Sequence, residues 1–279
     1  MGFTACTQNE DASPSLCGQA IHATFSIGGE TRVNTLGEGN KWENGDEVYV
    51  AVIGSNETAE CSLTATVADG NTDWSQHRDF SWRDEGENII YVSYPYKDNY
   101  KQGNFSLPTD QSSEPGFKSA DYINGYWQGR PTFAPLDISL DHRMAMVTVN
   151  YELGTADFDE GTVIDAFTIR SPYAGATFDL KTGDLAQATG SSIPVAAYKH
   201  DGTNQYSAII VPGALGTDDE FIKFSIGGKD YVTKLKMQTE FLEGIHYTYN
   251  LKVGKKKMEL TQISVDGDLT GWTNEEELD

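Results

Sequence analysis

Alternation between apolar and polar residues is the feature of this sequence that most constrains its fold. It is clearest near the C-terminus, where every second residue is apolar: Ile245, Tyr247, Tyr249, Leu251 and Val253. A period of two places these side chains on one face of an extended strand and the intervening polar residues on the other. The segment is therefore predicted to form a half-buried β-strand.

Similar runs recur along most of the chain. They cover residues 21–27, 48–53, 61–67, 78–82, 88–94, 145–153, 162–170, 206–211, 220–226 and 229–235. Turn signals such as Gly227-Gly228 separate them, and paired glycines suit the primed turns of tight hairpins. We find no amphipathic helix of ten or more residues. Many short strands without alternating helices predict an all-β, antiparallel β-sandwich fold.

The length of 279 residues allows two domains of ordinary size. Between residues 96 and 135 the alternation fades, in a segment rich in Gly, Pro, Ser, Asn and aromatic residues. We therefore predict a polar tether over residues 1–19, a first β-sandwich over 20–134 and a second over 135–279. The boundary at 135 carries a margin of about ten residues, because domain boundaries are read poorly from sequence.

The charge of the chain limits its partners. The 42 acidic and 20 basic residues give a formal net charge of −22. Such a surface repels phosphate backbones and anionic lipid heads, which disfavours nucleic-acid binding and electrostatic docking to membranes. No apolar run approaches the ~20 residues that cross a bilayer. Attachment to a membrane would therefore need a lipid anchor.

No motif of an enzyme, a cofactor site or a metal site is found. The sequence has no G-x-S-x-G, H-E-x-x-H, Walker or dinucleotide-binding pattern. His22 and His246 fall on the polar phase of their strands, where a solvent-facing side chain is expected, and His142 is expected to make a structural hydrogen bond. The sequence predicts a protein that is not an enzyme and binds no cofactor or metal.

The residues around Cys6 resemble the end of a lipoprotein signal peptide. The small residue Ala5 directly precedes the cysteine, and residues 7–19 are polar and aperiodic, as expected of a tether between a lipid and a folded domain. We therefore predict lipidation at Cys6 and export to the outer membrane. The other two cysteines, Cys17 and Cys61, can pair in a disulfide if the compartment is oxidising.

Several short motifs follow one another along nearly the whole chain. They are the strand that ends in Thr31-Arg32, Trp42 followed by Gly45-Asp46 and an apolar strand, Tyr94-Pro95-Tyr96, His142-Arg143-Met144-Ala145, Gly244–Leu251, and Trp272. In this order they resemble the motifs of the fimbrillin family of the Bacteroidales. The resemblance implies two tandem transthyretin-like β-sandwich domains, no active site, and a structural and adhesive subunit of a cell-surface fimbria.

The resemblance also implies a route of maturation and assembly. An arginine-specific protease cuts the outer-membrane lipoprotein precursor, and Arg32 matches the cleavage position. The strand that would then leave carries Ile21, Ala23, Phe25 and Ile27. A strand of the next subunit would fill the gap by β-augmentation. The implied partners are other fimbrial subunits, together with ligands on host or bacterial surfaces.

The segment from Met258 to Trp272 is the candidate donor of such a strand. Its apolar contacts would be Leu260, Ile263, Val265, Leu269 and Trp272, although Ile263 is out of phase with Leu260. A tip or accessory subunit would need only to accept a strand, so both roles stay open.

Two other functions stay open. The aromatic residues between 94 and 127, Trp127 among them, would suit a monomeric surface lipoprotein that binds glycans, because amphipathic rings provide contact surfaces for sugars. A β-sandwich glycosidase is the other alternative, since the separation that its carboxylate pair needs is spatial and cannot be read from sequence.

Overall fold

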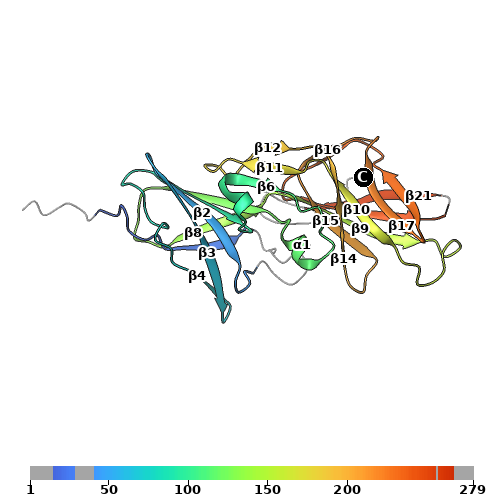
Figure 1. The fold of residues 1–279 in the computed structure, drawn as a ribbon, viewed down its shortest axis with the longest axis horizontal. Coiled ribbons are helices and arrows are strands. Elements are labelled where there is room, and N and C mark those ends of the chain that lie inside the picture. Colours follow the sequence, from blue (N-terminus) through green and yellow to red (C-terminus); the bar gives the residue numbers. More distant parts are fainter. Residues whose placement is uncertain (1–14, 29–40, 256, 267–279) are drawn as a thin grey trace, which may run out of the picture.

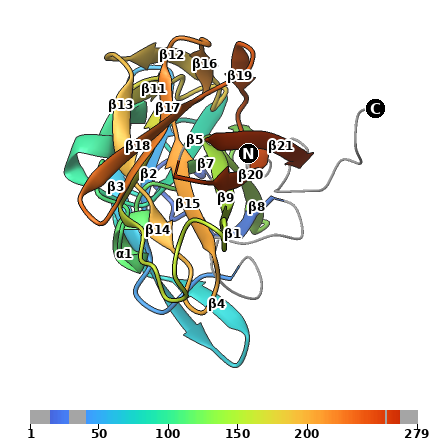
Figure 2. The same cartoon turned by 90° about the vertical axis from the view of Figure 1, so that its right-hand side faces the viewer.

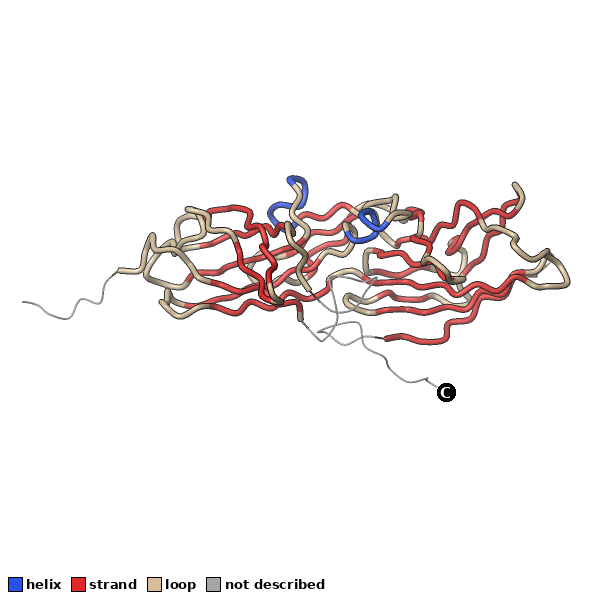
Figure 3. Tube along the Cα trace, turned by 90° about the horizontal axis from the view of Figure 1, so that it is seen from below, coloured by secondary structure: helices blue, strands red, loops and turns tan. Residues whose placement is uncertain are grey.

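The protein is built almost entirely from β-strands. A computed structural model describes residues 15–28, 41–255 and 257–266, with 52% strand and 5% helix. The all-β prediction is confirmed. Most strands run along an elongated molecule, as Figures 1 and 3 show. No described helix is long and apolar enough to cross a membrane.

A seven-stranded sheet forms the N-terminal half, in the order β1-β8-β7-β5-β2-β3-β4. The bounds of its strands are β1 Ala23–Ile27, β2 Glu47–Ile53, β3 Thr58–Ala68, β4 Asn71–Trp74, β5 Asn88–Tyr94, β7 Ile123–Gly129 and β8 Leu136–His142. Neighbouring strands are antiparallel, except that β1 runs parallel to β8. The sheet curls, because β1 and β4, at opposite ends of this order, contact each other.

The inner face of the curled sheet is apolar. Val48, Val50 and Val52, which alternate along β2, are fully buried in one cluster with Ile90 and Val92 of β5. β-Branched side chains pack well on a pleated surface. The curled sheet therefore encloses a core of its own.

Four smaller sheets make up most of the C-terminal half. Their orders are β14-β15-β9-β20-β21, β13-β10-β17-β18, β12-β11-β6 and β16-β19. The strands are β6 Asn104–Ser106, β9 Ala145–Leu153, β10 Asp165–Ser171, β11 Gly175–Phe178, β12 Leu185–Thr189, β13 Ile193–Ala196, β14 Tyr198–Lys199, β15 Gln205–Ile210, β16 Gly213–Leu215, β17 Glu220–Ile226, β18 Lys229–Lys234, β19 Thr239–Phe241, β20 His246–Val253 and β21 Met258–Asp266. Two short helices, η1 Asp98–Gly103 and α1 Glu114–Lys118, lie in the connection from β5 to β7.

The four- and five-stranded sheets of this half pack face to face. Figure 2 views them from the end of the molecule that lies on the right in Figure 1, with β17 and β18 on one side and β9 and β20 on the other. Phe167 of β10 stacks on Tyr206 of β15 with ring centroids 4.1 Å apart, and Phe221 of β17 meets Tyr249 of β20 at 5.2 Å. These rings belong to a second buried cluster that is separate from the first. A transthyretin-like relation between the two halves stays a prediction.

The two halves meet between β8 and β9. His142 ends β8 in the first sheet and Ala145 begins β9 in the second. The buried His142 Nδ1 lies 2.8 Å from Asp121 Oδ1, which confirms the structural hydrogen bond expected of this histidine. The division at residue 135 stays a prediction, and β8, which begins at Leu136, pairs with β1 and β7 of the first sheet.

The turn between β17 and β18 has the predicted geometry. φ is +57° at Gly227 and +78° at Gly228. A type I′ turn needs positive φ at both central residues, which glycine adopts at no steric cost. The paired glycines thus fix the register of this hairpin.

The expectation that His246 faces solvent is wrong, whereas His22 is exposed as expected. The Nε2 atom of His246 lies 2.8 Å from Thr148 Oγ1. From Thr148 the hydrogen bonds continue to Ser207 over 2.7 Å and from Ser207 to His200 over 2.8 Å. Burial, with a smaller contribution from His200, lowers the pKa of His246 to about 4.

Acidification is predicted to destabilise the fold through His246. An unfolded histidine binds a proton near pH 6.5, whereas folded His246 does so only near pH 4. The unfolded state therefore holds more protons in this window, and the free energy of unfolding falls as the pH drops through it. Denaturant unfolding at about pH 7 and pH 5 should show a smaller drop in the free energy of unfolding for His246→Gln than for the wild type. An equal drop in the two proteins would contradict this role.

Gln111 ties the connection from β5 to β7 to strand β15 of the second half. Its buried amide donates to the Ile209 carbonyl oxygen over 2.8 Å and accepts from the Ile209 backbone N–H over 2.8 Å. The side chain thus serves as the hydrogen-bond partner that a neighbouring strand would otherwise provide.

Replacing Gln111 by alanine is expected to lower the free energy of unfolding by about 2–4 kcal/mol, because two buried backbone groups would lose their partner. Denaturant titration measures this change. Gln187→Ala, at an exposed position of β12, is the matched control and should change stability by less than about 0.5 kcal/mol. A similarly small effect of both substitutions would show that the Gln111 hydrogen bonds do not contribute to the free energy of unfolding.

Candidate functional site

Strand β1 lies at the edge of the first sheet and pairs with a single strand. It runs parallel to β8, with Ala23 opposite Leu136 and Ile27 opposite Leu140. At the end of the strand the Gly28 N–H donates to the Leu140 carbonyl over 2.7 Å. An edge strand is attached to its sheet by one ladder of backbone hydrogen bonds only. The stability of its attachment therefore depends largely on the burial of its side chains.

The residues just before β1 form backbone hydrogen bonds with a different segment, residues 80–82. Ile21 N–H donates to the Phe80 carbonyl over 3.0 Å, and Trp82 N–H donates to the Gln19 carbonyl over 3.0 Å. The predicted strand over residues 78–82 is wrong, because this segment holds only one isolated bridge, from Ser81 to Ala20. It is a loop whose backbone is hydrogen-bonded to the N-terminal segment.

The side chains of this segment alternate between the core and the surface. Ile21, Phe25 and Ile27 are 1%, 4% and 8% exposed, and Ala23 is half-buried. The intervening Ser26 is exposed, and its hydroxyl donates to Asp137 Oδ1 over 3.2 Å. The segment therefore fills a groove in the first core with one face only.

Aromatic rings surround Phe25 in this groove. Its ring lies 4.9 Å from that of Trp74, edge to face, and 6.4 Å from that of Phe80. The Trp42 indole N–H donates to the Phe25 carbonyl over 2.6 Å, and the Trp42 ring meets Trp74 at 5.0 Å and Tyr94 at 5.4 Å. We call Trp42, Trp74, Phe80 and Tyr94 the aromatic cage.

Asp46 holds the cage in place through the turn before β2. Its carboxylate accepts from the Glu43 N–H over 2.7 Å and from the Tyr94 hydroxyl over 3.0 Å. Gly45 supplies the positive φ of this turn, +94°. Burial raises the pKa of Asp46 and that of Tyr94. The Trp42 and Gly45-Asp46 motif therefore has a structural role: it orients Trp42 and Tyr94 of the aromatic cage around Phe25.

The other predicted assembly residues lie elsewhere or outside the described part of the chain. Cys6, Arg32, Leu269 and Trp272 fall outside the described residues. Leu260 is 5% exposed in the second core. Ile263 and Val265 belong to β21, which pairs antiparallel with β20. The described part of the candidate donor segment is therefore engaged in its own sheet.

The two described cysteines are both free. The exposed Cys17 thiol donates to the Arg83 carbonyl over 3.2 Å. Burial raises the pKa of the Cys61 thiol to about 11, so it stays protonated and weakly nucleophilic near neutral pH. No disulfide between them contributes to the described fold.

Most of the aromatic side chains proposed for glycan stacking are buried. Tyr100 and Tyr122 are 2% and 0% exposed in the second core. Trp127 is half-buried, with its ring 5.4 Å from that of Trp82. Tyr126, which is 43% exposed, is the large aromatic of this stretch that the solvent reaches most easily. A glycan platform here would rest on fewer rings than the sequence indicated.

No described residues form a group of three or more His, Cys, Asp or Glu side chains that could hold a metal ion. The fold defines a class of β-protein in which an N-terminal edge strand completes the core of a curled sheet. Residues 31–272 match the fimbrillin-like family, and the chain belongs to that family. The resemblance seen in the sequence is confirmed.

Solved structures share this fold. A candidate cell adhesion protein of Bacteroides uniformis matches with a TM-score of 0.62 at 15% identity, over 81% of this chain and 93% of that protein. One from Bacteroides ovatus matches with 0.61 at 16%, over 90% and 98%. The tip fimbrial protein Mfa3 of Porphyromonas gingivalis, with its C-terminus truncated, matches with 0.53 at 12%, over 88% and 99%. A comparison with curated protein sequences gave no match.

Membership of the family supports a role as a fimbrial subunit, exported to the cell surface, with other fimbrial subunits as partners. The family and the proteins of the same fold are fimbrial and adhesion proteins rather than enzymes. The aromatic cage is the part of the groove that the alternation pattern does not reveal, because its rings come from four separate segments.

The substitution Phe25→Ala is predicted to lower the free energy of unfolding of the first half by about 3–5 kcal/mol, because it leaves a cavity inside the aromatic cage. His22→Ala, at an exposed position of the same segment, should cost less than about 0.5 kcal/mol. Tryptophan fluorescence during denaturant unfolding suits the measurement, because Trp42, Trp74 and Trp82 all belong to the first core. Equal stability of the two variants would show that Phe25 does not complete that core.

Proposed function

We propose that the chain is a structural and adhesive subunit of a cell-surface fimbria that is lipidated at Cys6 as a precursor and cut at Arg32, after which strand β1 leaves. One observation supports this proposal above all: residues 21–27 bury Ile21, Phe25 and Ile27 in the core, while the strand within this segment, β1, pairs with β8 alone. Because its side chains fill the core, the strand is needed to complete the fold. Because only one ladder of backbone hydrogen bonds holds it, another strand can replace it.

The energetics favour exchange after cleavage. Burial of three large apolar side chains contributes roughly 5–9 kcal/mol, at about 1.5–3 kcal/mol each. While β1 is part of the chain, its effective concentration at the groove is high, so it stays bound. Once the chain is cut at Arg32, β1 is an independent ligand, and a strand supplied by a neighbouring subunit can replace it.

The vacated groove would suit an extended segment with apolar residues at alternate positions. The N–H and C=O groups of β8 would lose their partner, and the aromatic cage would lose the ring of Phe25. Backbone pairing would then give affinity, and the pockets for alternate side chains would give specificity, as in β-augmentation generally. Strand acceptance is therefore the assembly step that the described residues support most directly.

Strand donation by this chain would need a larger rearrangement. Eight residue pairs join β21 to β20, from Val253 opposite Met258 to His246 opposite Asp266. Release of the segment would break this ladder and expose Leu260, which is buried in the second core. We keep the segment from Met258 to Trp272 as the proposed donor of a stalk subunit, and acceptance alone as the role of a tip or accessory subunit.

Treatment of the purified protein with an arginine-specific protease is predicted to release a fragment that ends at Arg32 and to promote polymer formation. Mass spectrometry identifies the fragment, and electron microscopy and sedimentation detect the polymers. Arg32→Lys should abolish both events. Arg78→Lys, at a side chain that is 90% exposed in the first half, is the matched control and should leave both unchanged.

Two outcomes would count against the proposal. Cleavage at other arginines while Arg32 stays intact would remove Arg32 as the maturation site. Cleavage at Arg32 without loss of β1, judged by Phe25 remaining protected from hydrogen exchange, would remove strand exchange as the mechanism.

A further inference from the structure

The two ends of the elongated molecule carry complementary features. Strands β7 and β8 pair at the junction of the halves, so residues 130–135, which connect them, lie at the far end of the first sheet (Figure 1). Strand β9 runs from the junction to the opposite end, where residues 154–164 connect it to β10. A pocket opens beside this second connection.

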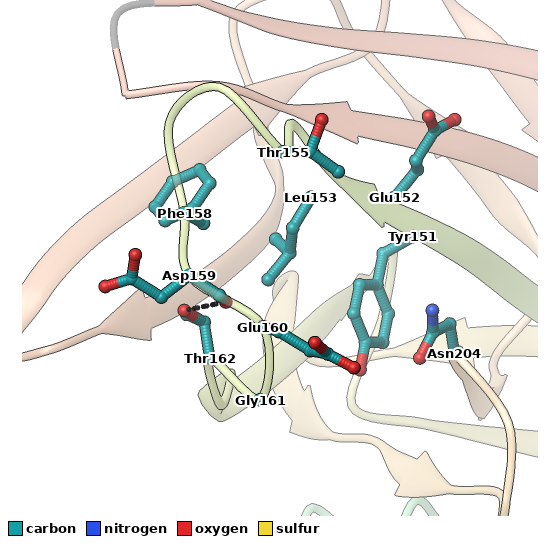
Figure 4. A pocket seen from close by; sticks show the side chains of 10 residues that line it. All are labelled: Tyr151, Glu152, Leu153, Thr155, Phe158, Asp159, Glu160, Gly161, Thr162 and Asn204. Carbon is teal, nitrogen blue, oxygen red and sulfur yellow. Dashed lines mark hydrogen bonds between the residues drawn. The ribbon is translucent and has the colours of Figure 1, made fainter.

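The pocket has an apolar floor. Leu153 lies between the rings of Tyr151 and Phe158, as Figure 4 shows. The volume of the pocket is about 660 Å³, which is more than one aromatic side chain fills. An apolar ring from outside can therefore lie over Leu153, with Tyr151 on one side and Phe158 on the other.

The rim of the pocket is acidic. Glu152, Asp159 and Glu160 line it, and none of the described residues that line it is Lys, Arg or His. Glu160 extends along the loop toward Tyr151 (Figure 4). Two ammonium groups lie near the rings although neither residue lines the pocket: that of Lys199 is 5.7 Å from the centre of the Tyr151 ring, and that of Lys255 is 5.8 Å from the centre of the Phe158 ring. Three carboxylates around an apolar floor favour an occupant that combines an apolar group with a positive charge.

Hydrogen bonds hold the pocket loop in shape. Thr162 Oγ1 donates to the Asp159 carbonyl over 2.8 Å, and the Phe158 N–H donates to the Gly154 carbonyl over 3.0 Å. The Lys255 N–H donates to the Asp157 carboxylate over 3.2 Å, which ties the loop to the turn between β20 and β21. Because the loop is already ordered, little conformational entropy is lost when the pocket is filled.

The loop at the other end presents the matching groups. Phe133 is 72% exposed, more than any other large apolar side chain of the described residues. Arg130 is exposed too, and it takes part in none of the ion pairs of the described residues. Thr132 Oγ1 accepts from the Ala134 N–H over 3.0 Å, which fixes the turn between them. Residues 129–136 contain no acid.

Two copies of this chain repel each other overall, since each carries a net charge of −22. A contact between copies therefore needs apolar burial together with locally opposite charge, and the two ends supply both. The contact joins different surfaces of the two copies. A heterologous contact closes into a ring only when the rotation between copies allows it and otherwise extends into a filament, whereas a symmetric contact stops at a dimer. A contact between opposite ends of an elongated molecule favours the filament.

We propose that the 130–134 loop of one copy docks into the pocket of the next, with Phe133 between Tyr151 and Phe158 and Arg130 against Glu160. This end-to-end contact rests on the proposed function as a fimbrial subunit. It also fits strand exchange, because β1 begins at the end that carries the 130–134 loop. A subunit docked at the 130–134 loop would therefore lie next to the end of the groove that β1 fills.

A photo-crosslinking residue in place of Phe133 tests the contact directly. The full chain carrying benzoylphenylalanine at position 133 is irradiated in two samples, the concentrated intact protein and the material assembled after cleavage. Mass spectrometry then locates the crosslinks. We expect crosslinks to residues 151–163 of a second copy in both samples. The same residue in place of Met237, which is 71% exposed elsewhere, should give no such crosslink.

The outcomes separate this contact from the proposed function. Polymers whose crosslinks fall outside residues 151–163 overturn the contact and leave the fimbrial role standing. Crosslinks to 151–163 in the concentrated protein without polymers after cleavage support the contact and overturn strand-exchange assembly. No crosslink to 151–163 in either sample overturns the contact.

Charge reversal provides a second test, since both positions are exposed and neither substitution should impair folding. Arg130→Glu or Glu160→Arg alone is expected to lower the crosslink yield about tenfold, as expected for a moderate interface hot spot. A chain that carries both substitutions should recover most of the yield, because the pair is restored with its charges exchanged. Equal loss in the double variant would overturn the pairing of Arg130 with Glu160.

Discussion

The contact of Phe25 with the aromatic cage is the interaction on which the first half depends. Trp74 and Phe80 lie beside its ring, and Trp42 binds its carbonyl oxygen. The other contribution of β1 to the sheet is one ladder with β8. Most of the stabilisation that this short strand provides is thus apolar burial, which any segment with the right alternate side chains can reproduce.

Alternation along the sequence identified this strand but not its surroundings. The period of two placed Ile21, Phe25 and Ile27 on one face, and the structure puts all three in the core. The parallel pairing with β8 was beyond the sequence, because it places Ala23 opposite the distant Leu136 and no local pattern encodes it. The aromatic cage was hidden for the same reason. Cys6 and Arg32 were chosen from motif alone and lie outside the described residues.

Burial on both faces explains one failure of the pattern, and side-chain hydrogen bonding explains another. Strand β7 was not predicted because Ile123, Asn124 and Gly125 are all buried at the junction, so no alternation exists there. His246 lies on a polar face as its phase indicates, but that face carries a chain of hydrogen bonds from Thr148 to His200 rather than open solvent. Polarity of a strand face therefore does not by itself establish exposure.

The direction of the strands bears on how the molecule carries mechanical load. Most strands of both halves run along the long axis (Figures 1 and 3). The hydrogen bonds of an antiparallel ladder lie perpendicular to the strands. A pull applied between the two tips would therefore load many hydrogen bonds of a ladder at once, in shear, instead of opening them one after another. A chain of such molecules joined end to end would resist stretching in the direction in which an attached filament is pulled.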